Sequence, residues 1–191
     1  MNAKEKFIKI FNDNIKREGA AELLAWLEKT DFFTAPASTK FHLCCEGGLC
    51  EHSVNVYECL YERYKDEHPA ETLAIVALLH DLCKAQFYKV STRNQKNEQT
   101  GQWEKVPYYT IEDRFPFGHD EKSVFLVERF MRLKIEEAIA IRWHMGGFDD
   151  SAKAGGFTVS NAFEMYPLAV KLHVADIEAT YLREGTPSVV E

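Results

Sequence analysis

The chain has 191 residues, of which 46% are hydrophobic and 28% are charged, and its net charge at pH 7 is −7. A chain of this length and composition is expected to form one globular domain, over residues 1–191, around a single substantial core. The acidic excess argues against binding to long nucleic acid, which proteins usually hold with an excess of lysine and arginine. No run of about 18 apolar residues is present, so we predict no membrane-spanning helix.

The amino-terminal segment and the cysteines favour a cytoplasmic protein. The first segment, MNAKEKFIKIFNDNIKR, has the pattern of an amphipathic helix and lacks the apolar centre of a secretory signal. The five cysteines are odd in number and form no CxxC pair. Such usage fits a reducing compartment better than a disulfide framework.

Hydrophobic periodicity predicts a mainly helical fold in the first part of the chain. Apolar residues recur at helical spacing in a first helix that ends near Gly19, a second over about 20–29 and a third over about 51–67. Pro69 ends the third helix and opens a fourth, since proline is well tolerated in the first turn of a helix. The fourth helix finishes with the stretch AIVALLHDLCK, residues 74–84.

Residues 86–110 have a different pattern. The segments QFYKVSTRN and WEKVPYYTI are β-prone, and the polar stretch QKNEQTGQ between them is turn-like. We therefore predict a small β-hairpin inserted in the helical body. Two more helices are predicted over about 120–133 and 135–145, and one long helix is predicted from Asn161 to about Arg183.

The most apolar helix ends on groups that resist burial. In AIVALLHDLCK, six apolar residues lead directly into His80 and Asp81, and Lys84 follows three positions later. Buried ionisable groups are costly unless they are paired or coordinate a cation. An imidazole nitrogen and a carboxylate oxygen suit a divalent transition metal, and near a helix end both can reach one point. The dipeptide alone is weak evidence, because His-Asp occurs again at His119 in what the pattern indicates is an exposed helix.

Further polar residues stand beside glycines and apolar stretches along the chain. His52 follows GGLCE near the start of the third helix, and His119 follows Gly118. His144 ends the stretch AIAIRWHMGG, and Asp176 lies inside the last helix. Side chains placed in this way on different helices can converge on one site.

The ordered motifs GGLCEHSVNV, ALLHDLCK, GHDEKS, IRWHMGG and LHVADIEA resemble the HD-domain metal-dependent phosphohydrolases, over roughly residues 40–183. They are most similar to compact bacterial HD hydrolases, which are related to the HD domain of 3′–5′ exoribonucleases. The resemblance implies a helical bundle. It also implies a metal-binding core, whose matching residues are His52, His80, Asp81 and Asp176. Two-metal members have extra histidines, and the residues that match these are His119 and His144.

The resemblance also implies roles for two catalytic residues. Asp81 would bridge both ions, and Lys84 takes the place of a lysine that contacts phosphate in many HD domains. Two departures from the family pattern stand out. Cys83 occupies a position where many relatives have glycine, and His144 is single where two-metal relatives often have a histidine pair.

This ligand set favours one or two divalent ions of Mn, Fe, Co, Ni or Zn, because histidine-rich coordination is unsuited to magnesium. The leading hypothesis is hydrolysis of a small nucleotide or related phosphate ester through a metal-activated water, with Lys84 stabilising the developing negative charge. Glu46, His42 and His119 are candidate proton donors to the leaving group. The alternatives are a 3′–5′ exonuclease acting on short single strands and a non-catalytic, metal-containing module that senses a ligand.

Other residues have simpler explanations. His173 is expected to be a hydrogen-bonded core histidine rather than a residue that orients Asp176. His68 is expected in an exposed turn, and one of Arg142 and Trp143 in the core. The hairpin lysines, arginine and aromatic residues are expected to be solvated or to pack across the strands, rather than to bind a phosphate or a base.

Overall fold

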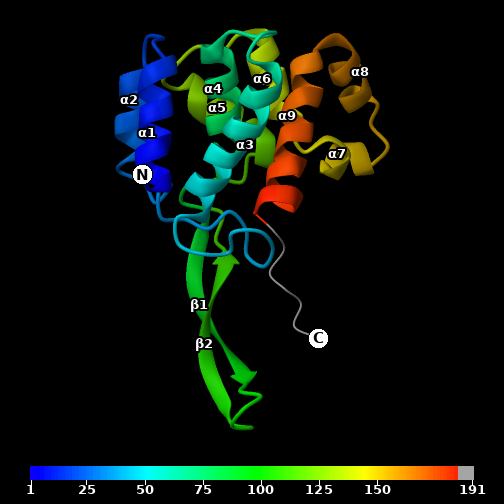
Figure 1. Ribbon diagram of the computed structural model, residues 1–191. Helices are drawn as coiled ribbons and strands as arrows, with labels where there is room; N and C mark the ends of the chain where they lie inside the picture. Colours follow the sequence, from blue (N-terminus) through cyan, green and yellow to red (C-terminus); the bar gives the residue numbers. More distant parts are fainter. Residues whose placement is uncertain (185–191) are drawn as a thin grey trace.

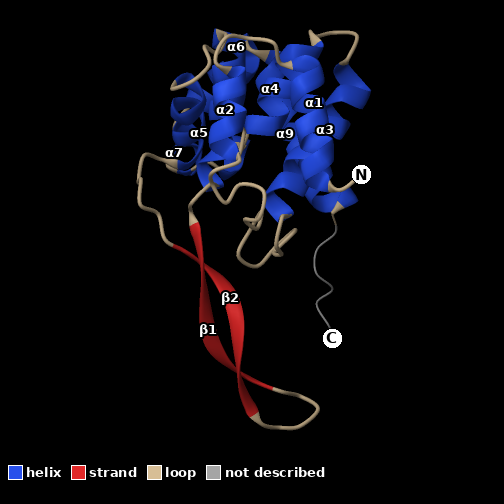
Figure 2. Cartoon of the chain, turned by 90° about the vertical axis from the view of Figure 1, so that its left-hand side faces the viewer, coloured by secondary structure: helices blue, strands red, loops and turns tan. Residues whose placement is uncertain are grey.

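The computed structural model describes residues 1–184. A helical body carries one long β-hairpin that projects from one end (Figures 1 and 2). The helices are α1 (Ala3–Asn14), α2 (Ala20–Leu27), α3 (Gly48–Tyr64), α4 (Ala70–Leu79), α5 (His119–Glu128), α6 (Ile135–Arg142), α7 (Asp150–Lys153), α8 (Thr158–Met165) and α9 (Pro167–Glu178). The prediction of a mainly helical fold with a small hairpin is confirmed. None of the described helices combines the length and the apolar character needed to cross a membrane.

Helix α4 lies at the centre of the body. Every residue from Leu73 to Leu79 is fully buried, and α1, α3 and α6 all contact the helix. A helix that is apolar on all sides is stable only when other elements surround it. As a result, the residues that follow its last turn are also delivered into the interior, and His80 and Asp81 are at most 2% exposed.

The first helix begins with a capping box. The Asn2 side chain accepts a hydrogen bond from the Glu5 backbone N–H (2.9 Å), and the Glu5 carboxylate accepts one from the Asn2 backbone N–H (3.0 Å). These bonds satisfy donors that the helix itself cannot pair. The apolar face of α1 then places Phe7 and Phe11 in the core, where Phe7 packs against Phe32.

The prediction of one long helix from Asn161 to Arg183 is wrong. The chain leaves the helical conformation at Tyr166 (φ −131°, ψ 82°), and a new helix begins at Pro167. Proline disfavours a helical conformation in the residue before it, yet suits the first position of a helix. Helix α9 then continues into a single turn of π-helix, Ala179–Arg183. The third predicted helix also differs slightly, since α3 begins at Gly48 and ends at Tyr64.

The hairpin consists of β1 (Tyr88–Lys96) and β2 (Trp103–Ile111), which pair antiparallel from Tyr88 opposite Ile111 to Lys96 opposite Trp103. Tyr88 packs against the hydrophobic core. Beyond it the ribbon leaves the body (Figure 2), and its outer residues are mostly exposed. In the sequence, the hairpin begins shortly after the segment that carries His80, Asp81 and Lys84.

Candidate metal centre

The structure brings the predicted ligands together from five separate segments. His52 comes from α3, His80 and Asp81 from the end of α4, His119 from the first residue of α5, His144 from the turn after α6, and Asp176 from α9. After Leu79 the chain leaves the α-helix at Asp81 (φ −99°, ψ 21°) and makes one 3₁₀ turn, Leu82–Lys84. This change of direction lets the adjacent side chains of His80 and Asp81 approach one point, with His80 Nε2 3.5 Å from Asp81 Oδ2.

The first group of ligand atoms surrounds one oxygen of Asp81. His52 Nε2 lies 3.7 Å from Asp81 Oδ2, 3.3 Å from His80 Nε2 and 3.1 Å from Asp176 Oδ1. These residues are buried or nearly so. The ligand atoms of His52, His80 and Asp81 all lie within 4.8 Å of one another, close enough to bind one divalent ion, and Asp176 forms a similar group with His80 and His144.

The second group surrounds the other oxygen of Asp81. His119 Nε2 and His144 Nε2 each lie 3.7 Å from Asp81 Oδ1. The two oxygens of this carboxylate therefore face different pairs of histidines. Such a carboxylate is suited to bridging two ions.

Two of the histidines are oriented by backbone carbonyls. His80 Nδ1 donates to the Ala77 carbonyl and His144 Nδ1 donates to the Ile141 carbonyl, each at 2.8 Å. A carbonyl oxygen can only accept, so the proton must be on Nδ1 in both rings. The lone pair of Nε2 is then directed toward the centre, as a metal ligand requires.

The other two histidines are oriented by carboxylates. His52 Nδ1 lies 3.0 Å from Glu184 Oε1, and His119 Nδ1 lies 2.5 Å from Asp120 Oδ1. A carboxylate bound to the far nitrogen fixes the ring and makes Nε2 a better ligand. All four histidines thus have Nδ1 occupied and Nε2 facing the centre.

The electrostatics of the centre favour a cation. Burial by itself lowers the pKa of His52, but Asp176 and Glu184 raise it to about 10. Burial likewise opposes the charge on His144, and Asp120 and Asp81 raise its pKa to about 9. Carboxylates in this cluster therefore hold protons on neighbouring imidazoles, and a metal ion can replace those protons.

The hydrogen bonding of Asp81 also fits the presence of a divalent metal ion. Asp81 Oδ1 is buried and accepts no hydrogen bond within residues 1–184, although an unpaired buried carboxylate oxygen is costly. The other oxygen, Oδ2, accepts a hydrogen bond from Lys84 Nζ at 2.6 Å. A divalent ion held by imidazole nitrogens beside Oδ1 would give that oxygen the partner that the protein does not provide.

The comparison with family models identifies the fold around this centre. The model of the HD domain matches residues 49–180, a range that contains all six predicted ligands. The chain belongs to the HD-domain superfamily of metal-dependent phosphohydrolases. The resemblance found in the motifs is therefore confirmed. No curated protein and no solved structure matches the chain in the corresponding comparisons.

Two residues at the centre of this HD domain did not emerge from the sequence. Asp120 was interpreted as part of an exposed helix, but it is 1% exposed and holds His119. Its position next to His119 was the available signal. Glu184 lies 132 residues from its partner His52 and beyond the range of the family match, so no spacing pattern indicated it.

The cavity of the HD domain has a volume of about 360 Å³ and an apolar rim. It is lined by five of the six predicted ligands, all except the fully buried His80, and by Lys84 and Lys153. Phe41, Phe148 and Tyr181 are more than half exposed at this cavity. The sequence did not single out these rim residues, because surface aromatics carry no distinctive spacing.

The secondary candidates fall in different places. His42 lines the cavity with its ring 4.8 Å from that of His52, and burial together with His52 and Lys84 lowers its pKa to about 4. It is therefore a neutral residue at pH 7 and a poor proton donor. Glu46 lines a separate hollow beside α1 and cannot donate a proton in this cavity.

The remaining expectations concern core and turn residues. His173 Nδ1 donates to the His144 carbonyl at 2.6 Å, as expected, but the residue is only partly buried and lines the cavity at the metal centre, so it does not lie in the core. Gly146 (φ +54°) lies against the His173 ring, where a Cβ atom would come within 2.6 Å of the ring. Trp143 is the member of its pair that packs in the core. His68 is only partly exposed, because its Nε2 lies 2.9 Å from Lys171 Nζ.

Proposed function

We propose that this HD domain hydrolyses a phosphate ester of a small molecule, with a nucleotide as the expected substrate class. The ligands of one or two divalent ions of Mn, Fe, Co, Ni or Zn would be His52, His80, Asp81, His119, His144 and Asp176. The observation that carries the proposal is the arrangement around Asp81, whose two buried oxygens face two different pairs of histidines.

The protein would contribute the metal ligands and a positively charged side chain, Lys84, to the reaction. A bound divalent ion acts as a Lewis acid and lowers the pKa of water toward neutrality. Lys84 lines the cavity. Burial lowers the pKa of its ammonium group, but the neighbouring Asp81 carboxylate raises that pKa above its ordinary value and keeps Lys84 protonated. Its role is to stabilise negative charge that develops on the phosphoryl oxygens.

The cavity favours a small substrate with an apolar or aromatic part. Its volume of about 360 Å³ lies at the small end of the range for small-molecule sites. Phe41, Phe148 and Tyr181 offer flat surfaces for a ring, and Lys153 offers a second positive charge. A nucleotide has both the ring and the phosphate that this combination suits.

Metal analysis and a phosphate-release assay test the proposal. Purified protein is analysed for bound metal and then assayed with nucleotides and an aryl phosphate in the presence of Mn, Co or Ni. We expect Asp81→Ala to lose both the metal and the activity while its helical circular dichroism is retained. Asp66→Ala, which removes an exposed carboxylate on the turn after α3, is the matched control and should behave like the wild type.

The same assays separate the two alternatives. Binding of short single strands with a steep dependence on salt concentration, followed by release of nucleotides, would favour the exonuclease. Metal-loaded protein that releases phosphate from none of the substrates would favour the non-catalytic sensing module. Full metal content in Asp81→Ala would contradict the bridging role of that residue.

A further inference from the structure

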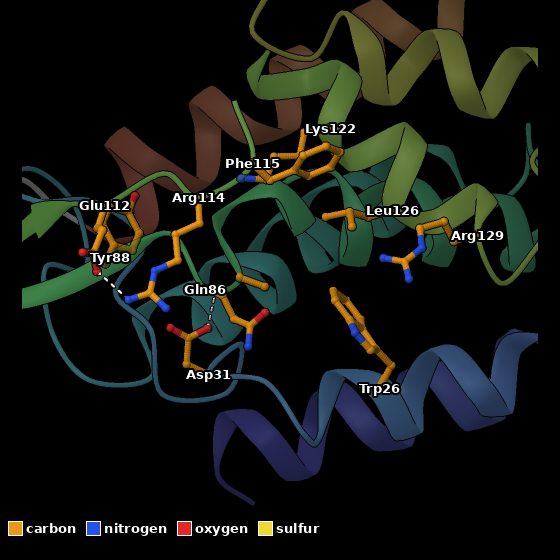
Figure 3. A pocket seen from close by; sticks show the side chains of 11 residues that line it. Trp26, Asp31, Gln86, Tyr88, Glu112, Arg114, Phe115, Lys122, Leu126 and Arg129 are labelled. Carbon is orange, nitrogen blue, oxygen red and sulfur yellow. Dashed lines mark hydrogen bonds and ion pairs between the residues drawn. The ribbon is translucent and has the colours of Figure 1, made fainter. Parts of the chain in front are cut away.

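A second cavity of about 540 Å³ opens between α2, α5 and the two segments that flank the hairpin. Figure 3 shows its lining side chains. None of them lines the cavity at the metal centre, so the two cavities are separate. The volume lies within the range for sites that bind small molecules.

Apolar and aromatic side chains face each other across part of this cavity. The indole of Trp26 extends from α2 toward Leu126 of α5 on the opposite side of the cavity, and the ring of Phe115 lies on the same side as Leu126 (Figure 3). Trp26 is held in place by Phe130, with the ring centroids 5.6 Å apart. A fixed indole next to open space offers a surface on which a flat ring can stack.

Another part of the wall is cationic, and its charges differ in how far they are neutralised. Lys122 Nζ donates to Asp113 at 2.7 Å, and Arg114 donates to Glu112 at 3.0 Å. Arg129, at the end of α5, makes no ion pair within residues 1–184. Its guanidinium is therefore free to bind a phosphate or carboxylate through two parallel hydrogen bonds.

The turn after the metal-binding segment adds a polar group. Gln86 has a positive φ of 56°, which is uncommon for a residue other than glycine. Its backbone N–H donates to Asp31 Oδ1 at 2.5 Å, and this bond holds the unfavourable conformation (Figure 3). The conformation places the Gln86 amide at the cavity, where it can donate to or accept from a ligand.

We propose that this cavity is a second binding site, for a small anion that carries a flat aromatic ring, the class that includes nucleoside monophosphates. The ring packs between Trp26 and Leu126, the Gln86 amide bonds to the edge of the ring, and Arg129 holds the anionic group. The inference does not depend on the proposed hydrolase activity, because no lining residue is shared with the metal centre.

The second cavity is formed by chain segments that continue directly into the metal centre. Ala85 and Gln86 line the cavity directly after Lys84, and Phe115 lines it four residues before His119. A ligand in this cavity therefore contacts the segment that carries Lys84 and the segment that carries His119.

Titration with AMP, followed by nuclear magnetic resonance, tests the proposal at the level of one residue. The indole N–H signal of Trp26 is assigned by its loss in Trp26→Phe, which distinguishes it from Trp103 and Trp143. We expect AMP to shift this signal to saturation, and adenosine and ribose 5-phosphate, which carry only the ring or only the phosphate, to bind at least roughly tenfold more weakly. Arg129→Gln should weaken AMP binding by about tenfold or more.

Two controls make the result specific. Arg132→Gln removes an exposed arginine three residues further on, outside the cavity, and should bind AMP like the wild type. Asp81→Asn disrupts the metal centre and prevents hydrolysis of AMP, so a Trp26 shift that persists in this variant reports the second cavity alone. The proposal is overturned if AMP leaves the Trp26 signal unchanged, if Arg129→Gln binds as tightly as Arg132→Gln, or if the shift disappears in folded Asp81→Asn.

Discussion

His52 Nδ1 lies 3.0 Å from Glu184 Oε1, and the Glu184 side chain is completely buried. The same carboxylate accepts a hydrogen bond from Asn55 Nδ2 at 3.0 Å, so it is fixed from two sides. Glu184 therefore determines which nitrogen of His52 faces the metal centre. It follows the π-helical turn Ala179–Arg183, which continues α9 and also contacts α3.

We expect Glu184→Gln to weaken metal binding by about 10- to 100-fold, because a neutral amide makes His52 a poorer ligand and fixes it less firmly. The affinity is measured by competition with a chelator of known affinity. Glu164→Gln, on the exposed side of α8, is the matched control. Equal affinities in these two variants would show that Glu184 does not orient the ligand.

The sequence was informative where a polar group interrupts a strong apolar pattern. His80 and Asp81 stood out because they follow six apolar residues, and the structure buries all of them around α4. The groups behind the ligands were hidden for a physical reason. Glu184 acts through a contact between segments far apart in the sequence, and Asp120 is adjacent to His119, where no local pattern distinguishes an orienting carboxylate from a solvated one.

The prediction of the fold failed at one position where a local signal existed. Pro167 divides the long carboxy-terminal helix, and proline inside a helical pattern is a recognised signal for such a break. Apolar periodicity on both sides of Pro167 obscured it. The break also separates α8 from α9, and only α9 carries a predicted ligand.

The two halves of the metal centre should be separable by substitution. His119→Ala removes a ligand atom only from the Oδ1 side of Asp81, and its side chain is 37% exposed, so little packing is lost. We expect this variant to bind one ion fewer than the wild type and Asp81→Ala to bind none. Metal content per chain, measured by mass spectrometry, decides the point, with His68→Ala as the control. Equal metal content in His119→Ala and the wild type would contradict a ligand role for His119.

Lys84 has a structural role in addition to the proposed catalytic one. Burial would raise the pKa of Asp81, yet Lys84 and His80 hold it well below its usual value. In metal-free protein, Lys84→Gln removes the ammonium group 2.6 Å from this buried carboxylate. We expect the free energy of unfolding to fall by about 2 kcal/mol, because a charged hydrogen bond is lost.

Added metal should restore most of the stability of Lys84→Gln, since an ion again neutralises Asp81. Phosphate release by the metal-loaded variant should fall by roughly 100-fold, the usual loss when one donor to a developing negative charge is removed. Thermal unfolding with and without metal checks the first result, and the assay of phosphate release checks the second. Lys84→Arg keeps the charge and should be less affected in both measurements.

Arg17 should be important for stability. Its guanidinium forms two hydrogen bonds with the fully buried carboxylate of Glu137, at 2.6 and 3.0 Å, and a third with Glu71 at 3.1 Å. It thereby connects the turn between α1 and α2 to both α4 and α6. Arg17→Met leaves Glu137 charged and buried, and we expect a loss of about 3 kcal/mol.

A second substitution tests the cause of that loss. Adding Glu137→Gln to Arg17→Met removes the uncompensated charge and should recover part of the stability, as denaturant unfolding would show. The loss of unfolding free energy caused by Glu137→Gln is measured in the wild type and in Arg17→Met. Equal losses in the two backgrounds would mean that the two side chains do not interact.

The hairpin should be removable without loss of the fold. Tyr88 packs against the core and is the residue opposite Ile111, so residues 89–110 can be replaced by an Asn-Gly turn that joins these two positions. The outer strand residues are mostly exposed, and a two-stranded ribbon adds little stability of its own. We expect the free energy of unfolding to change by about 1 kcal/mol or less and the metal content to be unchanged. A variant that is helical but binds no metal would mean that the hairpin positions Lys84 and Asp81. An unfolded variant would mean that the hairpin is part of the domain core and not an insertion.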